Sequence, residues 1–432
     1  MAATDPEHIM NHHESNTPVE TVASGTDQST LSGSIFDDLL RRNRLFCDRD
    51  KLRPTYTPAS LPHRTEEVAA LARLLAGTLK GESTPNVFLY GKTGTGKTAC
   101  VRSVTRELER AGTRRDVQVD VVHLNCEVTD TQYQVLAHLT NALVESNREV
   151  GGADAGPSPV PMTGLPTEVV YGTLVEAADC VERSLLVVLD EVDRLATKGG
   201  SSALYNLTQL AAVLERSRAT VLGISNDLTF TDTLDPRIRS RLGSDELVFP
   251  PYDATQLRDI IAERAAVAFE DGVLEDGVCA LVAALAAQEH GDARRALDLL
   301  RVAGELAERA DEGRVMEAHV RQAQARVEFD HTADLVESLP QQARLALAAV
   351  ASFDAFAPVE AVHERGLELA TNLDCTCPGR AQFSSALGDL DALGLVTLVS
   401  RTRPRSRQVR LSMRRRDLAR ILADTDLAGV VG

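Results

Sequence analysis

Lysine is almost missing from this sequence. Its 432 residues include five lysines and 41 arginines, and the formal net charge is −17. An ordinary acidic surface that keeps a protein soluble accounts for the charge but leaves the missing lysines unexplained. Scarce lysine together with abundant aspartate and glutamate indicates adaptation to a salt-loaded cytoplasm. The acidity therefore does not point to a basic binding partner.

Long apolar runs and a cysteine framework are also lacking. No stretch of about 18 apolar residues occurs, which predicts no membrane-spanning helix, and an N-terminus without an apolar segment predicts no signal peptide. The seven cysteines show no pairing pattern, and Cys375 and Cys377 have no second pair that would complete a zinc site. We expect a cytoplasmic protein in a reducing compartment.

Two of the five lysines and three glycines occur in one loop. The segment GKTGTGKT (91–98) satisfies G-x-x-x-x-G-K-[ST] between a β-prone run (86–90) and a helical pattern (98–111). Glycines let backbone N–H groups face phosphates, and the start of the helix adds a positive dipole end. We predict that the ammonium of Lys97 reaches the β- and γ-phosphates of ATP and that the hydroxyl of Thr98 ligates Mg²⁺. The predicted cofactor-binding loop comprises Gly91, Lys92, Thr93, Gly94, Thr95, Gly96, Lys97, Thr98 and Ala99, with the side chain of Lys92 solvated.

Strand and helix patterns alternate around this loop. Strand-like runs at 117–125, 185–189 and 219–227 are separated by helical stretches. This alternation predicts an α/β domain with a parallel, doubly wound sheet, in which ligands bind at the carboxyl ends of the strands.

Composition then divides the chain into four parts. Few large apolar residues predict a disordered tail at 1–34. An α/β nucleotide-binding domain follows at 35–250 and an all-helical lid at 251–330. Three helices and a β-hairpin at 331–426 predict a winged helix-turn-helix.

Two acids close the buried run at 185–189. Asp190 in that position can hold Mg²⁺ and Glu191 can polarise an attacking water; in isolation, a helix N-cap with an acidic first turn explains them equally well. Asn226 ends the next strand, where its amide can bond the attacking water or the γ-phosphate, or form an Asn-Asp turn.

Arginines occur at two further places of interest. Arg237, Arg239 and Arg241 form a cluster in which one can act as a finger on the γ-phosphate of a neighbouring subunit, or all can be a solvated basic face. Arg294 lies in the first turn of a helix, against the dipole preference, so a phosphate is expected to offset it. Arg295 lies farther from the helix start.

These motifs, in this order, resemble AAA+ ATPases of the initiator branch, and are similar to the archaeal origin-recognition/cell-division-control-six replication initiator family over roughly residues 40–425. The motifs that carry the resemblance are YTPASLPHRTEEV, GKTGTGKT, VVLDEVD, LDPRIRSRL, PPYDATQL and GDARRALDLL, followed by the winged-helix pattern. A long N-terminal tail and the segment DCTCPG (374–379) depart from the family, and the second leaves the start of the recognition helix open.

The resemblance implies roles for individual residues. Asp190 and Glu191 would form Walker B, Asn226 sensor 1 and Arg294 sensor 2, while the arginine finger would be Arg241 or else Arg239. It further implies that Tyr252 and Arg264 contact the nucleotide. The segment at 56–64 would line the adenine, and a helical insert that grips DNA would lie within 127–170.

An acidic chain can still hold DNA through local charge. Residues 401–420 contain nine arginines and one acid. We predict that Arg403, Arg405 and Arg407 read the minor groove and that a helix starting at Arg380 enters the major groove. That helix offers four side chains, Arg380, Gln382, Ser384 and Ser385, to base edges. The alternative is a protein-interaction domain with a solvated basic hairpin.

The sequence therefore predicts an ATP-dependent replication initiator from a halophilic archaeon, with slow, regulatory hydrolysis. Its expected cofactors are ATP and Mg²⁺, and its expected partners are double-stranded origin DNA, a replicative helicase and other initiator copies. Two alternatives stay open: an ATP-controlled winged-helix transcription regulator, and a clamp-loader-like ATPase that binds only protein. The arginines of the hairpin weigh against the second alternative.

Overall fold

The computed structural model describes most of the chain after residue 43. The described residues are 44–58, 60–129, 131–152, 154–197, 201–242, 245–289, 291–373, 375–400 and 407–423. The predicted disordered tail (1–34) lies outside these ranges, as do Arg403 and Arg405 of the predicted hairpin. None of the helices in the described ranges has the length and apolar character needed to cross a membrane.

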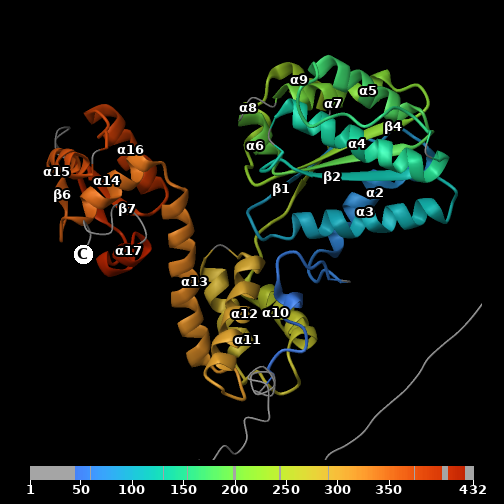
Figure 1. Ribbon diagram of the computed structural model, residues 1–432. Helices are drawn as coiled ribbons and strands as arrows, with labels where there is room; N and C mark the ends of the chain where they lie inside the picture. The colour runs from blue at the N-terminus through green and yellow to red at the C-terminus, as the bar shows by residue number, and fades with distance from the viewer. Residues whose placement is uncertain are drawn as a thin grey trace, which may run out of the picture. The chain divides into compact units, whose positions relative to one another are not determined.

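Five parallel strands form the central sheet of the first domain (Figure 1). They are β1 (Val87–Tyr90), β2 (Val119–Asn125), β3 (Ser184–Asp190), β4 (Arg218–Ser225) and β5 (Asp245–Val248), in the order β2-β3-β4-β1-β5. The prediction of a parallel sheet is confirmed. The sequence pattern did not predict β5, because this short run opens with two acids and pairs at the sheet edge with β1 alone.

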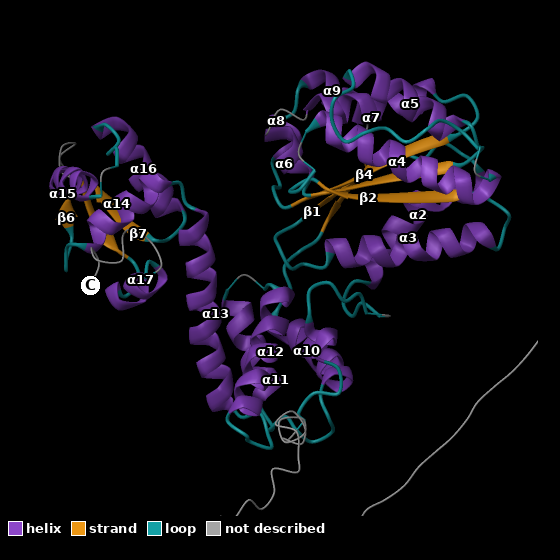
Figure 2. Cartoon of the chain, viewed as in Figure 1, coloured by secondary structure: helices purple, strands orange, loops and turns teal. Residues whose placement is uncertain are grey.

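Alternate residues of the strands face two different cores. Val87 and Leu89 of β1 pack with α2 and α3, whereas Phe88 and Tyr90 pack with α4, α5 and α7. Figure 2 shows α3 on one face of the sheet and α4 on the other. The helices are α2 (Thr65–Leu75), α3 (Lys97–Thr113), α4 (Gln132–Gly151), α5 (Thr167–Asp179) and α7 (Ser201–Val213). Because strand side chains alternate between faces, this double burial explains why the strands read as continuous apolar runs.

Several element boundaries differ from the predictions. Helix α4 extends to Gly151, into a segment predicted to be a loop, since the buried amide of Asn147 in its last turns donates a hydrogen bond to the carbonyl of Ala177 in α5. A 3₁₀ segment (Ala76–Lys80) continues α2. The short helices α6 (Val192–Thr197), α8 (Phe230–Thr233) and α9 (Pro236–Leu242) were not predicted.

A helical lid follows the sheet domain. It consists of α10 (Ala254–Ala268), α11 (Val278–Gln288), α12 (Ala293–Arg309) and α13 (Glu317–Ser338). The chain before the sheet domain packs on this lid: Leu45, Phe46 and Leu52 of the segment that includes η1 (Arg49–Leu52) are buried in its core. The ring of Phe46 stacks on Phe269 with centroids 4.4 Å apart. Residues 44–52, which the sequence groups with the sheet domain, therefore belong to the lid core.

The C-terminal part contains a second small sheet. Its strands are β6 (Ala357–Pro358), β7 (Val396–Ser400) and β8 (Arg407–Leu411), antiparallel in the order β6-β8-β7. The helices are α14 (Gln341–Ala351), α15 (Val359–Asn372), α16 (Arg380–Ala392) and α17 (Arg415–Ile421), of which only α17 was not predicted. Helix α13 runs through the predicted boundary at 330/331, with Val320 in the lid core and Val336 in the C-terminal core.

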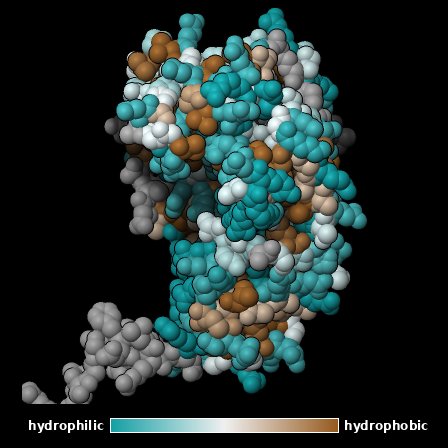
Figure 3. All heavy atoms as spheres, turned by 90° about the vertical axis from the view of Figure 1, so that its right-hand side faces the viewer, coloured by the Kyte–Doolittle hydropathy of each residue, from teal (hydrophilic) through white to brown (hydrophobic). Residues whose placement is uncertain are grey.

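Arginine forms surface ion pairs for which many proteins also use lysine. Figure 3 shows one face that is largely hydrophilic, with hydrophobic residues in small groups. On α12 a single guanidinium, that of Arg301, contacts the carboxylates of both Asp298 and Glu305. These carboxylates raise the pKa of Arg301 against the opposing effect of its partial burial. The planar fork of arginine permits such shared contacts, which a lysine ammonium makes less well.

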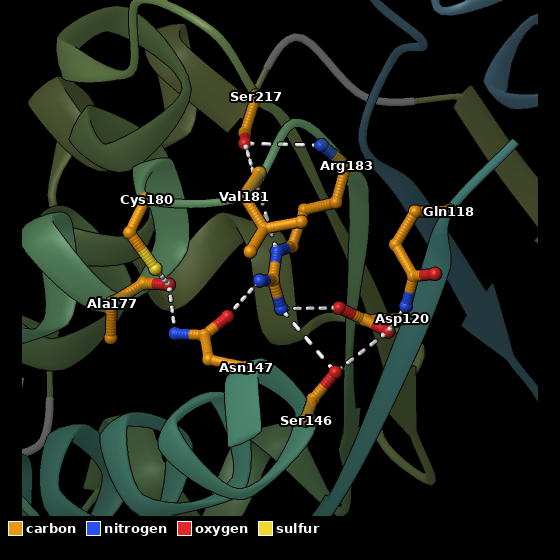
Figure 4. Close-up of polar contacts among 9 residues, drawn as sticks. All are labelled: Gln118, Asp120, Ser146, Asn147, Ala177, Cys180, Val181, Arg183 and Ser217. Atoms are coloured by element: carbon orange, nitrogen blue, oxygen red, sulfur yellow. Dashed lines mark hydrogen bonds and ion pairs between the residues drawn. The ribbon is translucent and has the colours of Figure 1, made fainter. Parts of the chain in front are cut away.

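Figure 4 shows a buried arginine whose polar contacts connect several segments of the sheet domain. It lies just before β3, whereas the phosphate loop follows the carboxyl end of the parallel strand β1. The guanidinium of Arg183, just before β3, is fully buried and contacts the carboxylate of Asp120 in β2 and the side-chain oxygen of Asn147 in α4. Its Nε donates to the carbonyl of Val181, and its backbone N–H donates to the hydroxyl of Ser217. The side chain of Arg183 therefore joins a strand and a helix to its own loop, and its backbone N–H joins the loop of Ser217.

Replacing Arg183 by alanine should destabilise the protein without changing nucleotide affinity. Asp120 would keep a poorly hydrated carboxylate without its partner, and breaking a buried ion pair in this way costs about 3–5 kcal/mol. Urea unfolding measures the loss, and Arg114→Ala, which removes an exposed ion pair with Glu107, serves as the control with a much smaller effect. Equal midpoints for the two variants would contradict a stabilising role for the buried cluster.

Candidate nucleotide-binding site

A cavity of about 360 Å³ lies between the phosphate loop and the lid. Its walls come from the segment 54–62, the loop 93–99, the ends of β2, β3 and β4, and helices α10 and α12. Asp190, Glu191 and Asn226 all line it. The carboxyl ends of three parallel strands therefore meet at this cavity, where an α/β sheet binds ligands.

Two glycines let the loop pass close to the lid. Gly94 and Gly96 have φ angles of 72° and 90°, in the left-handed region. A Cβ at Gly94 would lie 1.7 Å from Oδ1 of Asp292, and a Cβ at Gly96 would lie 2.6 Å from the hydroxyl oxygen of Tyr252. A side chain at either position would be strained by the left-handed backbone and would displace Asp292 or Tyr252. Glycine therefore lets the loop backbone approach the lid closely.

Lys97 begins α3 with its ammonium buried beneath the loop. Its Nζ donates hydrogen bonds to the carbonyls of Gly91 at 2.6 Å and Lys92 at 2.9 Å, and to Oδ1 of Asn226 at 3.0 Å. Burial lowers the pKa of Lys97 to about 8, although the carboxylate of Asp190 partly opposes this shift. All three hydrogen-bond acceptors are neutral, so an anionic phosphate at this position would supply the missing counter-charge.

The affinity for ATP should depend on pH through this ammonium. In the ligand-free protein the pKa of Lys97 is about 8, and a bound phosphate favours the charged form and raises that pKa. Below about pH 8 Lys97 is already protonated, so ATP binding requires no further proton. Above that pH Lys97 is mostly neutral and must take up a proton when the phosphate binds. The affinity should therefore fall as the pH rises from about 8 towards 10.5, the usual pKa of lysine. Titrations with ATP from about pH 7 to about pH 9.5 test this, and a flat profile would contradict it.

The two acids at the end of β3, Asp190 within the strand and Glu191 just after it, differ in environment. Oδ2 of Asp190 accepts a hydrogen bond from the hydroxyl of Thr98 at 3.0 Å, and its Oδ1 accepts from the backbone N–H of Glu191 at 3.1 Å. Glu191 has a left-handed φ of 56°. Burial raises the pKa of Glu191, as do the carboxylates of Glu127 and Asp190. The Thr98–Asp190 pair offers the oxygen ligands that Mg²⁺ prefers, and strained backbone at Glu191 is a feature typical of active sites.

In the first turn of α12 two adjacent arginines, Arg294 and Arg295, have different surroundings. Asp292 caps the helix by accepting hydrogen bonds from the backbone N–H groups of Arg294 and Arg295, and the N–H of Ala293 donates to the carbonyl of Gly94. Arg294 lines the cavity, whereas the side chain of Arg295 forms an ion pair with Glu289. Of the two, Arg294 is therefore the one placed to meet a ligand.

Tyr252 and Arg264 also line the cavity, and both are mostly buried. The guanidinium of Arg264 lies over the ring of Tyr56, 4.5 Å from its centroid, and donates to the Tyr56 carbonyl at 3.3 Å. Burial lowers the pKa of Arg264, and one terminal nitrogen has no hydrogen-bond partner among the described residues. Buried donors normally have a partner, so this nitrogen fits a site that a ligand completes.

Other predicted site residues do not meet at the cavity. Arg239 forms an ion pair with Asp232 at 3.1 Å, and neither Arg237 nor Arg239 lines the cavity. The side chain of Arg241, in α9, lies outside the described part of the chain. Lys92 contributes its carbonyl to the loop while its side chain is exposed, as expected. An arginine finger acts on the γ-phosphate of a neighbouring subunit, so it must lie away from the nucleotide site of its own chain. The arginine-finger assignment stays a prediction.

The predicted DNA-contacting residues lie in the C-terminal part. Arg380 and Gln382 are exposed in the first turn of α16, and Ser384 is half-buried. Phe383 between them is buried in the C-terminal core. Arg407 is the exposed first residue of β8. Helix α16 thus buries one face and exposes polar side chains on another.

Two residues of the site region were not assigned individually from the sequence. Asp292 contacts Gly94 of the loop, and Arg64 bonds the carbonyl of Thr95. Both contacts join segments far apart in the chain. The motif GDARRALDLL already contains Asp292 and the motif YTPASLPHRTEEV contains Arg64, but only the packing shows what each side chain touches.

The sheet order, the glycine loop with its buried lysine, the paired acids and the helical lid define an AAA+ ATPase fold. In agreement, residues 60–222 match the family model of the AAA ATPase domain, and residues 258–325 match that of the Cdc6 AAA+ ATPase-type lid domain. The class predicted from the motifs is thereby confirmed.

Similar proteins identify the family within this class. An ORC1-type DNA replication protein of Pyrococcus furiosus is 44% identical over 88% of this chain and 90% of its own length. ORC1-type DNA replication protein 4 of Haloarcula marismortui is 39% identical over 95% of this chain and 88% of its own length. The structure of the Aeropyrum pernix ORC1 protein in complex with DNA is 40% identical, with a TM-score of 0.78, covering 89% of this chain and 98% of that one. The chain belongs to the family of ORC1-type DNA replication proteins.

Proposed function

We propose that this protein is an ATP-dependent replication initiator that binds double-stranded origin DNA and controls helicase loading. The observation that carries the proposal is the 40% identity and TM-score of 0.78 with an ORC1 protein in complex with DNA. ATP binding to the loop and slow hydrolysis would regulate assembly on the origin. The haloarchaeal relative and the scarcity of lysine together support a halophilic archaeal source and a cytoplasmic, nucleoid-associated location.

In this proposal the cavity is the ATP site. The loop N–H groups and the ammonium of Lys97 bind the β- and γ-phosphates, because glycines leave the loop backbone open and the hydrogen-bond acceptors of the ammonium among the described residues are neutral. Thr98 and Asp190, already hydrogen-bonded to each other, would hold Mg²⁺. A bound Mg²⁺ would neutralise charge on the phosphate oxygens. Tyr252 and Arg264 contact the nucleotide.

The remaining site residues act on the γ-phosphate and the attacking water. The carboxylate of Glu191 polarises the water, and Asn226, which holds Lys97, orients the water or the γ-phosphate. Arg294 in the first turn of α12 senses the γ-phosphate from the lid. The arginine finger towards a second copy is Arg241, with Arg239 and Arg237 as alternatives.

The domains follow from these roles. The nucleotide-binding domain is the range 35–250 apart from residues 44–52, whose apolar side chains are buried in the lid core. The lid is 251–330 and the winged helix-turn-helix is 331–426, with α13 spanning the boundary between them. The polar N-terminal part of α16, with Arg380, Gln382 and Ser384, supports its assignment as the recognition helix. The strands β7 and β8 flank the segment that would form the wing, with Arg407 at its end.

Mapping of bound DNA across the source genome tests the proposal most directly. Enrichment at a small number of replication origins, stronger for the ATP-bound protein, is the expected result. Enrichment at many promoters would instead favour an ATP-controlled transcription regulator. Absence of DNA binding would favour an ATPase that acts on protein alone.

The double variant Arg403→Ala/Arg405→Ala should weaken binding to origin DNA and leave ATP binding unchanged. Each lost base contact is worth about 1–3 kcal/mol. Contacts to phosphates alone weaken steeply with salt, whereas base and shape reading persists for the correct sequence. Measuring the affinities for origin and random DNA, from low to molar KCl, separates attraction to phosphates from base and shape reading. Equal affinity of wild type and variant throughout that range would exclude the wing as the DNA reader.

A further inference from the structure

We propose that Arg64 is a positioning residue that couples the phosphate loop to the hinge of the lid. The hinge is defined as residues 249–253, between β5 and α10. The proposal rests on the proposed function of the cavity as an ATP site. Arg64 immediately precedes α2, and only 2% of its surface is exposed. Large arginines are rarely buried to this extent unless every donor has a partner.

The guanidinium of Arg64 bonds three different segments. Its Nε donates to the carbonyl of Thr95 in the phosphate loop at 3.0 Å. One terminal nitrogen donates to the carbonyl of Pro250 in the hinge. The other forms an ion pair with Glu67, one turn along α2, at 2.7 Å. One rigid fork therefore fixes the distance between the loop and the hinge.

Aromatic residues of the hinge complete this contact. The guanidinium lies over the ring of Tyr252, 4.0 Å from its centroid, and 5.6 Å from that of Phe249. The hydroxyl of Tyr252 in turn lies against Gly96 of the loop, where a Cβ would be only 2.6 Å away. Burial raises the pKa of this phenol, so it stays neutral at physiological pH. Arg64 and Tyr252 thus hold the hinge against the loop from two sides.

The bond to Thr95 has a consequence for phosphate binding. The carbonyl of Thr95 and the N–H of Gly96 belong to one peptide unit, and in a planar trans peptide they point in opposite directions. Because Arg64 holds the carbonyl, the N–H of Gly96 is directed to the opposite side, and Gly96 lines the cavity. Arg64 therefore orients a loop donor without touching the nucleotide itself.

The lid side of the hinge is anchored by the neighbouring segment. The hydroxyl of Ser60 donates to Glu263 and His63 contacts Asp259 at 3.0 Å, both in α10. The residues before Arg64 are thus attached to the lid, while Arg64 itself is attached to the loop. A movement of the lid must act on Arg64, which gives ATP in the loop a direct mechanical connection to lid position.

The test compares Arg64→Met with the wild-type chain and with Arg53→Met as a control. Arg53 precedes the same segment, but its side chain is exposed and the ion pair that it forms among the described residues is with the exposed Asp50. Loss of hydrogen bonds from a charged donor should weaken ATP binding by on the order of tenfold or more. ATP should also no longer protect the lid from protease more than ADP does. Arg53→Met should match the wild type in both measurements.

The Arg64→Lys variant tests whether the protein needs the planar guanidinium of Arg64 or only a buried positive charge. It also provides the test of the coupling if Arg64→Met does not fold. A lysine ammonium keeps the charge but cannot reproduce the planar fork that joins two carbonyls. We expect this variant to fold, to bind ATP more weakly and to lose the ATP-dependent protection. Full rescue by lysine, or an Arg64→Met variant indistinguishable from the wild type, would overturn the coupling while leaving the ATP site intact. A wild-type chain that binds no ATP would overturn the proposed function and the coupling with it.

Discussion

The Lys97→Ala variant is expected to lose ATP binding almost completely. The ammonium of Lys97 lies inside the phosphate loop, where it is hydrogen-bonded to neutral oxygens. Removing one partner of a buried charge pair costs about 2–5 kcal/mol, which corresponds to a loss of affinity of roughly 30-fold to several thousand-fold. Equilibrium titration with a fluorescent ATP analogue measures this directly.

The loss should not come from unfolding. Burial lowers the pKa of Lys97 to about 8, so carrying the charge in the ligand-free protein is unfavourable below that pH. The penalty is fully present below pH 8 and is relieved as the pH rises towards 10.5, because only the unfolded state stays protonated in that window. The variant should therefore fold at neutral pH. Lys80→Ala, at an exposed lysine paired only weakly with Glu82, is the control that should bind ATP like the wild type.

The Glu191→Gln variant is expected to bind ATP normally and to hydrolyse it poorly. Glutamine keeps the size of the side chain but cannot accept a proton from water, and loss of a general base lowers rates by about 10²–10⁴. Binding should persist because Lys97, Thr98 and the loop are unchanged. Single-turnover hydrolysis and nucleotide affinity, measured side by side, separate the two effects.

Two further measurements test the role of Glu191. Burial raises the pKa of its carboxyl group, so hydrolysis by the wild type should decline as the pH falls through that raised pKa and the base becomes protonated. Glu246→Gln, on the exposed face of the edge strand β5, should leave hydrolysis unchanged. Hydrolysis at the wild-type rate by Glu191→Gln would show that another group activates the water.

Local features of this protein were readable from the sequence. The phosphate loop depends on a strand, a glycine turn and a helix start within a dozen residues, so its glycines and Lys97 reveal it without knowledge of the fold. The same holds for Asp190 and Glu191 at the end of a fully buried run, and for Asn226 at the end of the next. Parallel topology follows from alternating patterns, because parallel strands need a crossover connection.

The strand at the edge of the sheet and the ends of helices were harder to predict from the sequence. The strand β5 carries two acids and forms because its backbone pairs with β1, and the last turns of α4 are held by contacts with α5. Residues 44–52 carry no sign in the sequence that they pack on a lid that begins 200 residues later in the chain. In each case packing against a distant segment outweighs the local pattern.

The tertiary structure alone decided how distant side chains act together. Asn226 meets Lys97 across 129 positions of sequence, and Arg64 meets Pro250 across 186. The choice of Arg294 over Arg295 at the cavity is fixed by the ion pair that holds Arg295 to Glu289. Sequence spacing predicts neighbours along a helix or a strand, but it contains no information on which distant backbone a long side chain will reach. That depends on how the sheet, the loop and the lid pack, and only the folded chain specifies it.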